Sequence, residues 1–311
     1  MKISFYVDNK EQDKKIEKVI KNEYKTIPMS IIFKLLRKGN ILVNSQKAKL
    51  GQVVVLGDLI EFDIEEKFLE HSKKVIEIIF EDDNLLIIDK PFGIPSHPDN
   101  NDEYSVVDWI NDRYRSKSDF IPALCHRLDR NTGGLLIIAK NRQSLSEMLK
   151  YFSDKKIQKK YLALTKSSDI KKQDKLVSYL YKDQKNNKVF ISDKQQKGFS
   201  KIITKYKIIN KIEDLFLVEA EIITGKTHQI RAHLAHIGIP IIGDDKYGDW
   251  KLNKKYKAEY QCLYAYYIHF NFEKRGLLQY LSNAKFVRNI VTFPIEDEKF
   301  KCFNISELRG I

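Results

Sequence analysis

The string ALCHRLDRNTGGLLIIAK gathers side chains that could do chemistry. His126, Arg127, Asp129 and Arg130 lie within five positions, directly before an apolar run that is typical of a strand. Polar groups in a tight loop at the edge of a packed sheet can be rigid and still accessible, as catalysis requires. A carboxylate flanked by two guanidinium groups stays ionised near neutral pH, because the positive charges favour its charged form. Asp129 is therefore a candidate nucleophile or electrostatic stabiliser; the alternative is a structural lattice of Arg and Asp at a turn.

A second polar string, ITGKTHQIRAHLAHIGIPIIGDDKYGD, contains a predicted helix. Thr224 or Thr227 is expected to begin this helix, because a hydroxyl can cap the first turn. His228 and Arg231 are three positions apart, and this spacing places them on one face of a helix. Both side chains are therefore expected to point the same way.

The second string also allows a metal-binding interpretation. His228, His233 and His236 match no zinc-binding spacing, so ordinary polar helix residues are favoured and no metal is expected. The turn with Asp244 and Asp245 predicts either a wall of a site or a simple turn. Neither string is enough by itself to predict a reaction.

The elements that must position these strings belong to a larger domain that is mostly β with peripheral helices. Residues 75–91 predict two strands around an Asp83-Asn84 turn, and SVVDWINDRY predicts a helix capped by Ser105. Further on, the pattern predicts a strand in GLLIIAK, a helix over about 142–153, a strand in IQKKYLALT, several strands between 176 and 224, and a late strand in QCLYAYYIHFNF.

Residues 1–62 predict a separate, small module with helices before strands. One helix surrounds Ile16, Val19 and Ile20; a second is expected to be capped by Ser30 and to end at Gly39, before strands in GNILVN and VVVLGDLIEF. The module has a basic stretch without acidic residues, which predicts a positive side. Its members are Lys25, Lys34, Arg37, Lys38, Lys47 and Lys49.

The net charge of +13 is concentrated in one segment. Residues 150 to 211 hold 18 Lys, no Arg and five acidic residues, which is also +13, so the rest of the chain balances to zero. A local excess of this size attracts a polyanion, either nucleic acid or an acidic membrane. The alternative is a solvated lysine-rich face.

The remaining composition bounds the class of protein. A chain of 311 residues with 42% hydrophobic and 31% charged residues is expected to fold rather than to be disordered. Cys125, Cys262 and Cys302 are far apart and form no disulfide framework, which favours a reducing cytoplasm. The start has no apolar signal region and the chain has no uncharged apolar run of about 20 residues, so neither secretion nor a membrane partner is expected.

Four ordered motifs together resemble the RluA-type pseudouridine synthases. HRLDRNTGG is similar to that family's catalytic loop, LLIIDKPFGIPSHP to its first motif, KKYLAL to its tyrosine motif, and GKTHQIRAHLAHIGIPIIGDDKYG to its last. GFSKIITKYKII and GDDKYGDWKLNKKY are most similar to the branch C of the ribosomal large-subunit enzymes. LLRKGNILVN and LGDLIEF resemble an S4 RNA-binding module.

The resemblance implies an organisation and a fold. It implies an α+β fold with a mixed, mostly antiparallel catalytic sheet and peripheral helices, plus a small S4-like α/β domain. The expected boundaries are 1–66 for the S4-like domain, 67–76 for a linker and 77–311 for the catalytic domain.

The resemblance also implies an activity without a cofactor. The expected protein is a monomeric, cytoplasmic isomerase that converts uridines of 23S ribosomal RNA, free or in large-subunit assembly intermediates, to pseudouridine. Asp129 matches the family's essential aspartate, Arg231 the arginine that pairs with it, and Tyr161 the tyrosine that stacks on the target base. Arg127 matches a residue that fills the gap left by a flipped nucleotide. The other expected RNA-binding residues are His126, Arg130, Arg37, Lys38, Lys47 and Lys49.

The chain departs from the family pattern at three places. Thr132 is followed by Gly133 where the family commonly has Ser, so a looser loop is expected, and Lys226 stands where Arg is usual. The opening helix of the S4-like module, DKKIEKVI, lacks the usual Arg-Leu-Asp start. None of these changes touches Asp129, Arg231 or Tyr161.

Three other functions compete with this interpretation. A transfer-RNA pseudouridine synthase would share the fold, but such relatives often lack the S4-like module. A non-catalytic RNA-binding assembly factor would explain the basic regions but not Asp129, Arg231 and Tyr161. A glycosidase that uses Asp129 with Asp244 or Asp245 would need a sugar cleft rather than surfaces that attract polyanions.

Overall fold

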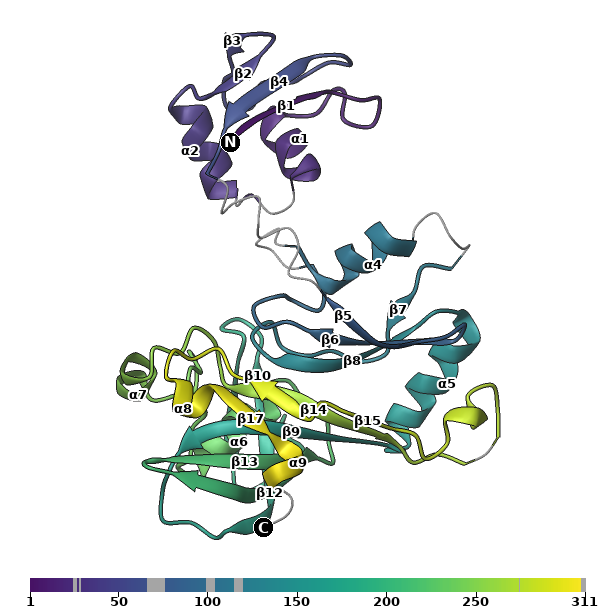
Figure 1. Ribbon diagram of the computed structural model, residues 1–311, viewed down its shortest axis with the longest axis vertical. Coiled ribbons are helices and arrows are strands. Elements are labelled where there is room, and N and C mark those ends of the chain that lie inside the picture. Colours follow the sequence, from purple (N-terminus) through teal and green to yellow (C-terminus); the bar gives the residue numbers. More distant parts are fainter. Residues whose placement is uncertain are drawn as a thin grey trace. The chain divides into compact units, whose positions relative to one another are not determined.

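The computed structural model describes residues 1–24, 27, 29–65, 76–98, 104–114, 120–273 and 275–308. These residues divide into two units, one within Met1–Val75 and His97–Trp109, the other within Ile76–Ser96 and Ile110–Ile311 (Figure 1). The predicted linker at 67–76 lies outside the described residues except for Ile76. Within the described ranges, no helix is long and apolar enough to cross a membrane.

The smaller unit is a four-stranded antiparallel sheet with two helices. Its elements are β1 (Lys2–Tyr6), α1 (Ile16–Glu23), α2 (Met29–Arg37), β2 (Ile41–Val43), β3 (Gln46–Lys47) and β4 (Leu59–Asp63), with the sheet order β1-β4-β2-β3. Ile16, Val19 and Ile20 are fully buried, as their helical spacing predicts.

Two details of the smaller unit differ from the sequence-based expectations. Ser30 lies inside the first turn of α2 rather than before it, so it does not begin the helix. Strand β1 was not predicted, because its pairing with β4 joins residues about 60 positions apart and leaves no local signal. Gly39, with φ of +66°, follows α2 as expected of a left-handed helix end.

The larger unit contains the remaining elements. The strands are β5 (Glu77–Glu81), β6 (Leu85–Lys90), β7 (Ala123–Leu124), β8 (Gly133–Ala139), β9 (Ile157–Lys166), β10 (Gln173–Asp183), β11 (Lys188–Ser192), β12 (Ser200–Ile212), β13 (Leu215–Ile222), β14 (Leu263–Phe270), β15 (Lys285–Val287), β16 (Ile290–Thr292) and β17 (Cys302–Asn304). The helices are α5 (Arg142–Ser153), α6 (Gln229–His236), α7 (Trp250–Lys255), α8 (Glu298–Lys301), α9 (Ile305–Leu308) and a 3-10 turn (Gln279–Leu281). Helix α4 (Val106–Tyr114) spans the division between the units.

One 11-stranded sheet organises the larger unit (Figure 1). Its order is β11-β10-β12-β13-β9-β14-β8-β6-β5, with β15 beside β14 and β7 beside β8. The pair β14 and β8 is parallel, and the other pairs in this sheet are antiparallel. The predicted α+β fold with a mixed, mostly antiparallel sheet and peripheral helices is therefore confirmed.

The register of four central strands brings the three candidate segments together. Tyr161 on β9 lies opposite Ala265 on β14 and opposite Ala220 on β13, and Ala265 in turn pairs with Gly134 on β8. Strand β8 follows the loop with Asp129, and β13 leads into α6. Tyr161 therefore lies between the start of β8 and the end of β13, from which the other two segments emerge.

Candidate active site

The loop between β7 and β8 that carries Asp129 is held on both sides by buried groups. The Ser96 hydroxyl donates to the Leu128 carbonyl at 2.7 Å and accepts from the Leu128 N–H at 3.1 Å. The ammonium of Lys90, fully buried in β6, donates to the Arg130 carbonyl at 2.9 Å. Backbone bonds immediately before and after Asp129 fix where its side chain starts. Neither Ser96 nor Lys90 was predicted as a site residue, because the role of each depends on a loop more than 30 residues away.

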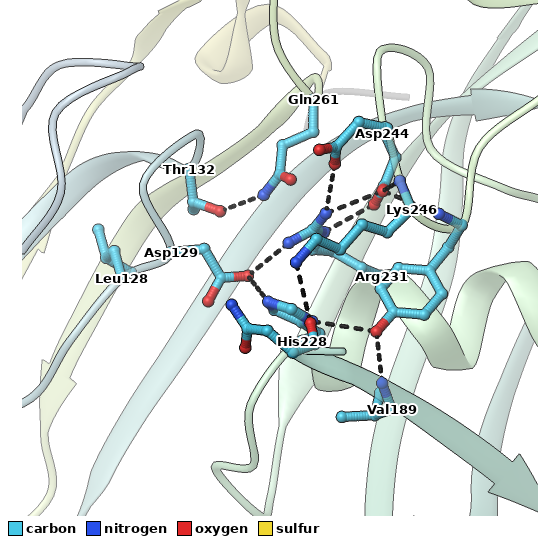
Figure 2. A network of polar contacts seen from close by, with 12 residues as sticks. Leu128, Asp129, Thr132, Val189, His228, Arg231, Asp244, Lys246 and Gln261 are labelled. Carbon is cyan, nitrogen blue, oxygen red and sulfur yellow. Dashed lines mark hydrogen bonds and ion pairs between the residues drawn. The ribbon is translucent and has the colours of Figure 1, made fainter. Parts of the chain in front are cut away.

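Arg231 contacts Asp129 across 102 residues of sequence. Its Nη1 donates to Asp129 Oδ2 at 3.1 Å, while its Nε and Nη2 donate to the two carboxylate oxygens of Asp244 at 2.7 and 2.9 Å (Figure 2). Nη2 also donates to Asp245 at 3.1 Å. Burial alone would lower the pKa of Arg231, but the bonds to Asp244 and the charge of Asp129 outweigh it and raise the pKa. Arg231 is therefore a permanent cation in front of Asp129.

Asp244 is the fixed anchor of this arginine. Its carboxylate is fully buried and accepts the backbone N–H groups of Lys246 at 2.9 Å and Tyr247 at 3.0 Å. Burial works to raise the pKa of Asp244, yet Arg231 and the two N–H groups lower it below the usual range. The bidentate pair sets the plane of the guanidinium, so one edge remains for Asp129. From the sequence, Asp244 was expected only as part of the wall of a site, as a turn residue or as a glycosidase carboxylate.

His228 approaches Asp129 from the residue before α6. Its backbone is left-handed, with φ of 52°, and α6 starts at Gln229, so neither threonine begins the helix as predicted. His228 Nε2 lies 3.9 Å from Asp129 Oδ2. Burial lowers the pKa of His228 to about 4, which leaves the ring neutral at physiological pH. His228 and Arg231 thus both face Asp129, although His228 is not part of the helix.

A chain of hydrogen bonds leads to His228 and favours one tautomer of its ring (Figure 2). The Val189 N–H donates to the Tyr247 hydroxyl oxygen at 2.8 Å, and that hydroxyl lies 3.0 Å from His228 Nδ1. Because the oxygen already accepts one N–H, donation of the phenol proton to Nδ1 is the favoured arrangement. In a neutral ring this arrangement corresponds to a proton on Nε2, the nitrogen that faces Asp129.

Asp129, Arg231, His228 and Tyr161 line one cavity of about 770 Å³. Tyr161 is buried, and burial together with the negative charge of Asp129 raises the pKa of its phenol. The hydroxyl is therefore protonated at neutral pH and can donate a proton or a hydrogen bond. The ring remains available as a stacking surface on the cavity wall.

A lysine on β9, Lys159, lines the same cavity. The Lys159 ammonium lies 4.9 Å from the centre of the Phe152 ring, and burial lowers the pKa of Lys159 to about 8. Lys159 and Tyr161 are two positions apart on β9, so their side chains lie on the same face of the strand. Across the described residues, no ion pair joins Lys159 to a carboxylate.

The predicted RNA-binding residues of the first string have different surroundings. Arg127 is exposed and lines the cavity. His126 also lines the cavity, but its Nε2 accepts the Ile137 N–H at 3.1 Å, and burial with the charge of Lys159 holds its pKa well below the usual value. Arg130 does not line the cavity; its carbonyl accepts the bond from Lys90.

The predicted RNA-binding residues of the smaller unit are exposed. The Arg37 Nε donates to the Phe33 carbonyl at 3.3 Å, and the Lys47 side chain lies close over Gly39. The exposed residues of this set are Arg37, Lys38, Lys47 and Lys49.

The three histidines of the second string point to separate partners. His228 contacts Tyr247, the two ring nitrogens of His233 contact the hydroxyls of Thr204 and Ser178, and His236 contacts Asp193. In the part of the chain that the structure describes, no three His, Cys, Asp or Glu side chains gather as ligands for a metal ion.

Comparison with known proteins identifies the family. A family model described as RNA pseudouridylate synthase matches residues 84–236. A ribosomal large subunit pseudouridine synthase C from Buchnera aphidicola is 32% identical over 289 residues, 87% of this chain and 90% of that protein. The chain belongs to the RluA-type pseudouridine synthases. A Vibrio vulnificus protein of the same name is 33% identical over 78% of this chain and 79% of its own, and an uncharacterized RNA pseudouridine synthase from Mycoplasma pneumoniae is 33% identical over 92% and 95%.

Solved structures agree on the fold. The human RNA pseudouridylate synthase domain containing 4 has a TM-score of 0.55 at 23% identity and covers 68% of this chain and 87% of that one. The human domain containing 1 has a TM-score of 0.54 at 17% identity, over 76% and 95%. The family model and the relatives in sequence, in turn, show that the protein is a pseudouridine synthase, an isomerase that acts on RNA.

Gly133, which departs from the family pattern, and Gly134 after it lie in strand β8, not in the loop. A Cβ on Gly133 would come within 2.9 to 3.0 Å of the rings of Tyr264 and Phe92. A Cβ on Gly134, with φ of +110°, would lie 2.3 Å from the Ala265 carbonyl oxygen. The two glycines therefore allow β8 and β14 to approach closely, and the expected looser loop is wrong at these positions. Lys226, the other departure within the motifs, lines the cavity.

Proposed function

We propose that this pseudouridine synthase isomerises uridines of large-subunit ribosomal RNA, with Asp129 as its essential carboxylate. The observation that carries the proposal is the contact between Arg231 and Asp129 at 3.1 Å in the wall of a cavity of about 770 Å³. The proposed substrate rests on the relatives from Buchnera and Vibrio, which are named for the ribosomal large subunit.

The proposed chemistry begins with cleavage of the bond between C1′ and N1 of uridine. Positive character develops at the sugar, and an ionised Asp129 can stabilise or trap it, much as a carboxylate does in glycoside cleavage. Removal of a sugar proton by Asp129 is the alternative. Both routes use the negative charge of the carboxylate, which the contact with Arg231 at 3.1 Å holds in place.

The detached uracil must then rotate and rejoin C1′ through C5. The C5 proton leaves and N1 gains a proton, so the product is an isomer of the substrate and no cofactor is required. Tyr161 can stack on the free base and retain it in the cavity, and its protonated hydroxyl is a candidate for the relay of the proton.

Access of a structured RNA to this cavity requires base flipping. Extrusion of a paired base costs a few kcal/mol, which stacking and side chains that fill the gap offset. Arg127 is exposed at the cavity, and its planar guanidinium suits a position within the base stack.

The smaller unit supports the choice of ribosomal RNA over transfer RNA. We propose that it is an S4-like RNA-binding domain that uses Arg37, Lys38, Lys47 and Lys49, all of them exposed. A non-catalytic assembly factor would have no need of a carboxylate held against a buried arginine.

The direct test is incubation of the protein with unmodified large-subunit ribosomal RNA. Pseudouridine is mapped by chemical labelling and reverse-transcription stops, with unmodified transfer RNA as a parallel substrate. We expect new stops in the ribosomal RNA at specific uridines. Stops in transfer RNA alone would show that transfer RNA, rather than ribosomal RNA, is the substrate. The absence of stops in both RNAs would contradict the proposed function.

A further inference from the structure

An aromatic row crosses three strands at one end of the large sheet. Strand β10 lies between β11 and β12, and its register places Tyr181 directly opposite Phe190 on β11. Phe199, immediately before β12, stacks on Tyr181 with ring centres 5.4 Å apart and planes inclined by 30°. Residues directly opposite each other in a sheet share a face. Tyr181 and Phe190 are 43% and 50% exposed, so this row presents open ring surface to solvent.

The same face becomes basic along the strands. Successive pairs are Tyr179 with Lys201, Val177 with Ile203, and Lys175 with Lys205. These positions alternate with those of the opposite face, so they continue the face of Tyr181. The residues that form this surface, called the aromatic platform below, are Lys175, Tyr179, Tyr181, Phe190, Phe199, Lys201 and Lys205.

The opposite face of these strands is already occupied. Ser178 and Thr204 are buried there and contact His233 of α6. Asp193 contacts both Ser178 and His236, so this carboxylate belongs to the α6 side. Of the two faces of these described strands, the one with the aromatic platform is therefore open to a partner, and Asp193 does not neutralise its lysines.

The platform meets the active-site cavity at Glu221. Tyr161 shares a face with Ala220 and Tyr206, the face that α6 covers, so the platform lies on the other face of the sheet. Lys205 lies opposite Glu221 on β13, with Nζ 3.4 Å from its carboxylate. Glu221 lines the active-site cavity and also a neighbouring groove of about 370 Å³, to which Lys175 and Lys205 contribute. A chain that leaves the cavity past Glu221 can therefore pass around this edge of the sheet and continue along β10 to the rings.

We propose that the aromatic platform binds an unpaired segment of the substrate RNA next to the target uridine. Bases would stack on Tyr181 and Phe190, while Lys175 and Lys201 contact phosphates. Every base has a flat face, so such stacking tolerates any sequence and excludes duplex, in which the bases already stack on one another. The proposal rests on the action of this enzyme on RNA and adds the part of the substrate that this surface recognises.

The test uses a 12-nucleotide RNA without uridine, so that binding is independent of isomerisation. Its affinity for the full-length protein is measured by fluorescence anisotropy, beside a duplex of the same strand. We expect Tyr181→Ala and Phe190→Ala each to weaken single-strand binding about 10-fold and to change duplex binding by less than about 2-fold. Tyr181→Phe retains the ring and is expected to bind like the wild type.

The matched control is Trp250→Ala, which removes a 70% exposed aromatic side chain from α7, outside the platform. It is expected to leave single-strand binding unchanged, and thermal melts confirm that each variant folds. Wild-type affinity in both alanine variants, or equal losses of affinity for duplex and single strand, would overturn the proposal. The platform would then be a candidate surface for a protein partner instead. Intact platform binding without any pseudouridine formation would instead count against the proposed function.

Discussion

Two groups of charged residues at the active site differ in how they are paired. In the paired group, Asp129, Arg231 and Asp244 form ion pairs with distances between 2.7 and 3.1 Å. In the unpaired group, Lys159 and Arg127 line the cavity, and no ion pair among the described residues gives either a carboxylate partner. The paired group is organised before substrate arrives. The unpaired group retains positive charge that an RNA phosphate can neutralise.

This difference suits the two tasks of the site, which are to stabilise charge during the reaction and to bind RNA. Stabilisation of a developing charge is most effective when the groups are already oriented and need not reorganise. Capture of a polyanion instead requires cations that are not already paired. Changes in the paired group of Asp129, Arg231 and Asp244 should therefore alter turnover or folding. Changes in the unpaired group of Lys159 and Arg127 should alter affinity for RNA.

The largest effect is expected from Asp129→Asn. The amide keeps the shape of the side chain but cannot supply the negative charge, so kcat should fall by about 10³-fold or more. RNA affinity should stay within a few-fold of the wild type, because Asp129 contributes no attraction to phosphates. Single-turnover assays and anisotropy measure the two quantities. Persistent activity would show that Asp129 is not the essential carboxylate.

Asp244→Asn should destabilise the fold more than the matching change at Asp245, because Asp244 anchors Arg231 in the interior and Asp245 contacts it at the surface. It removes a charge that is fully buried beside Arg231, and the loss of one partner of a buried pair costs about 3 kcal/mol of unfolding free energy. Asp245→Asn is the matched control, since Asp245 also contacts Arg231 at 3.1 Å but is 66% exposed, and it should cost less than about 1 kcal/mol. Urea denaturation measures both variants. Equal losses would contradict the anchoring role of Asp244.

Tyr247→Phe should test the tautomer of His228. The change leaves the Val189 N–H and His228 Nδ1 without the hydroxyl, so the ring proton is no longer directed to Nε2. We expect kcat to fall about 10-fold with little change in KM, as for the loss of one hydrogen-bonding group. Tyr206→Phe, which removes a bond to the Lys171 carbonyl, serves as the control. Equal effects of the two changes on kcat would assign Tyr247 a merely structural role.

The smallest effect concerns Lys159 and pH. Its pKa of about 8 means that the ammonium is present below pH 8 and lost above it, so wild-type RNA affinity should decline between pH 7 and pH 9. Lys159→Gln should weaken binding about 5-fold at pH 7 and remove this decline, while Lys159→Arg should keep strong binding at pH 9. Lys160→Gln is the control, because Lys160 is paired with Glu219 at 2.9 Å. A decline that persists in Lys159→Gln would point to another group.

Local pattern was enough to predict most elements of the larger unit. The helix over 142–153 and the strands around Asp83-Asn84 follow from periodicity and turn residues. The pairing of Arg231 with Asp129 was expected only from family resemblance, since 102 residues separate them. Hydrophobic pattern specifies which residues are buried, but it does not specify which distant loops meet.

The supporting groups of the site had no sequence signal. Lys90 and Ser96 donate hydrogen bonds to backbone carbonyls of a distant loop. Because every residue has a backbone carbonyl, the sequence does not indicate which one a side chain will contact. The left-handed backbone conformation of His228 was likewise not predictable from the sequence, because non-glycine residues adopt this conformation rarely and only where the surrounding structure imposes it. The bidentate contact of Asp244 with Arg231 required the turn after α6 to fold back over that helix.

The close packing at Gly133 has an evolutionary consequence. The space that a serine side chain would enter there is bounded by the rings of Phe92 and Tyr264, which come from segments on either side of it in the sequence. The residue tolerated at position 133 therefore depends on the residues at 92 and 264, and substitutions at the three positions should be epistatic. A serine introduced at 133 alone would press its Cβ against these two rings, so it should be better tolerated together with a smaller residue at 92 or 264.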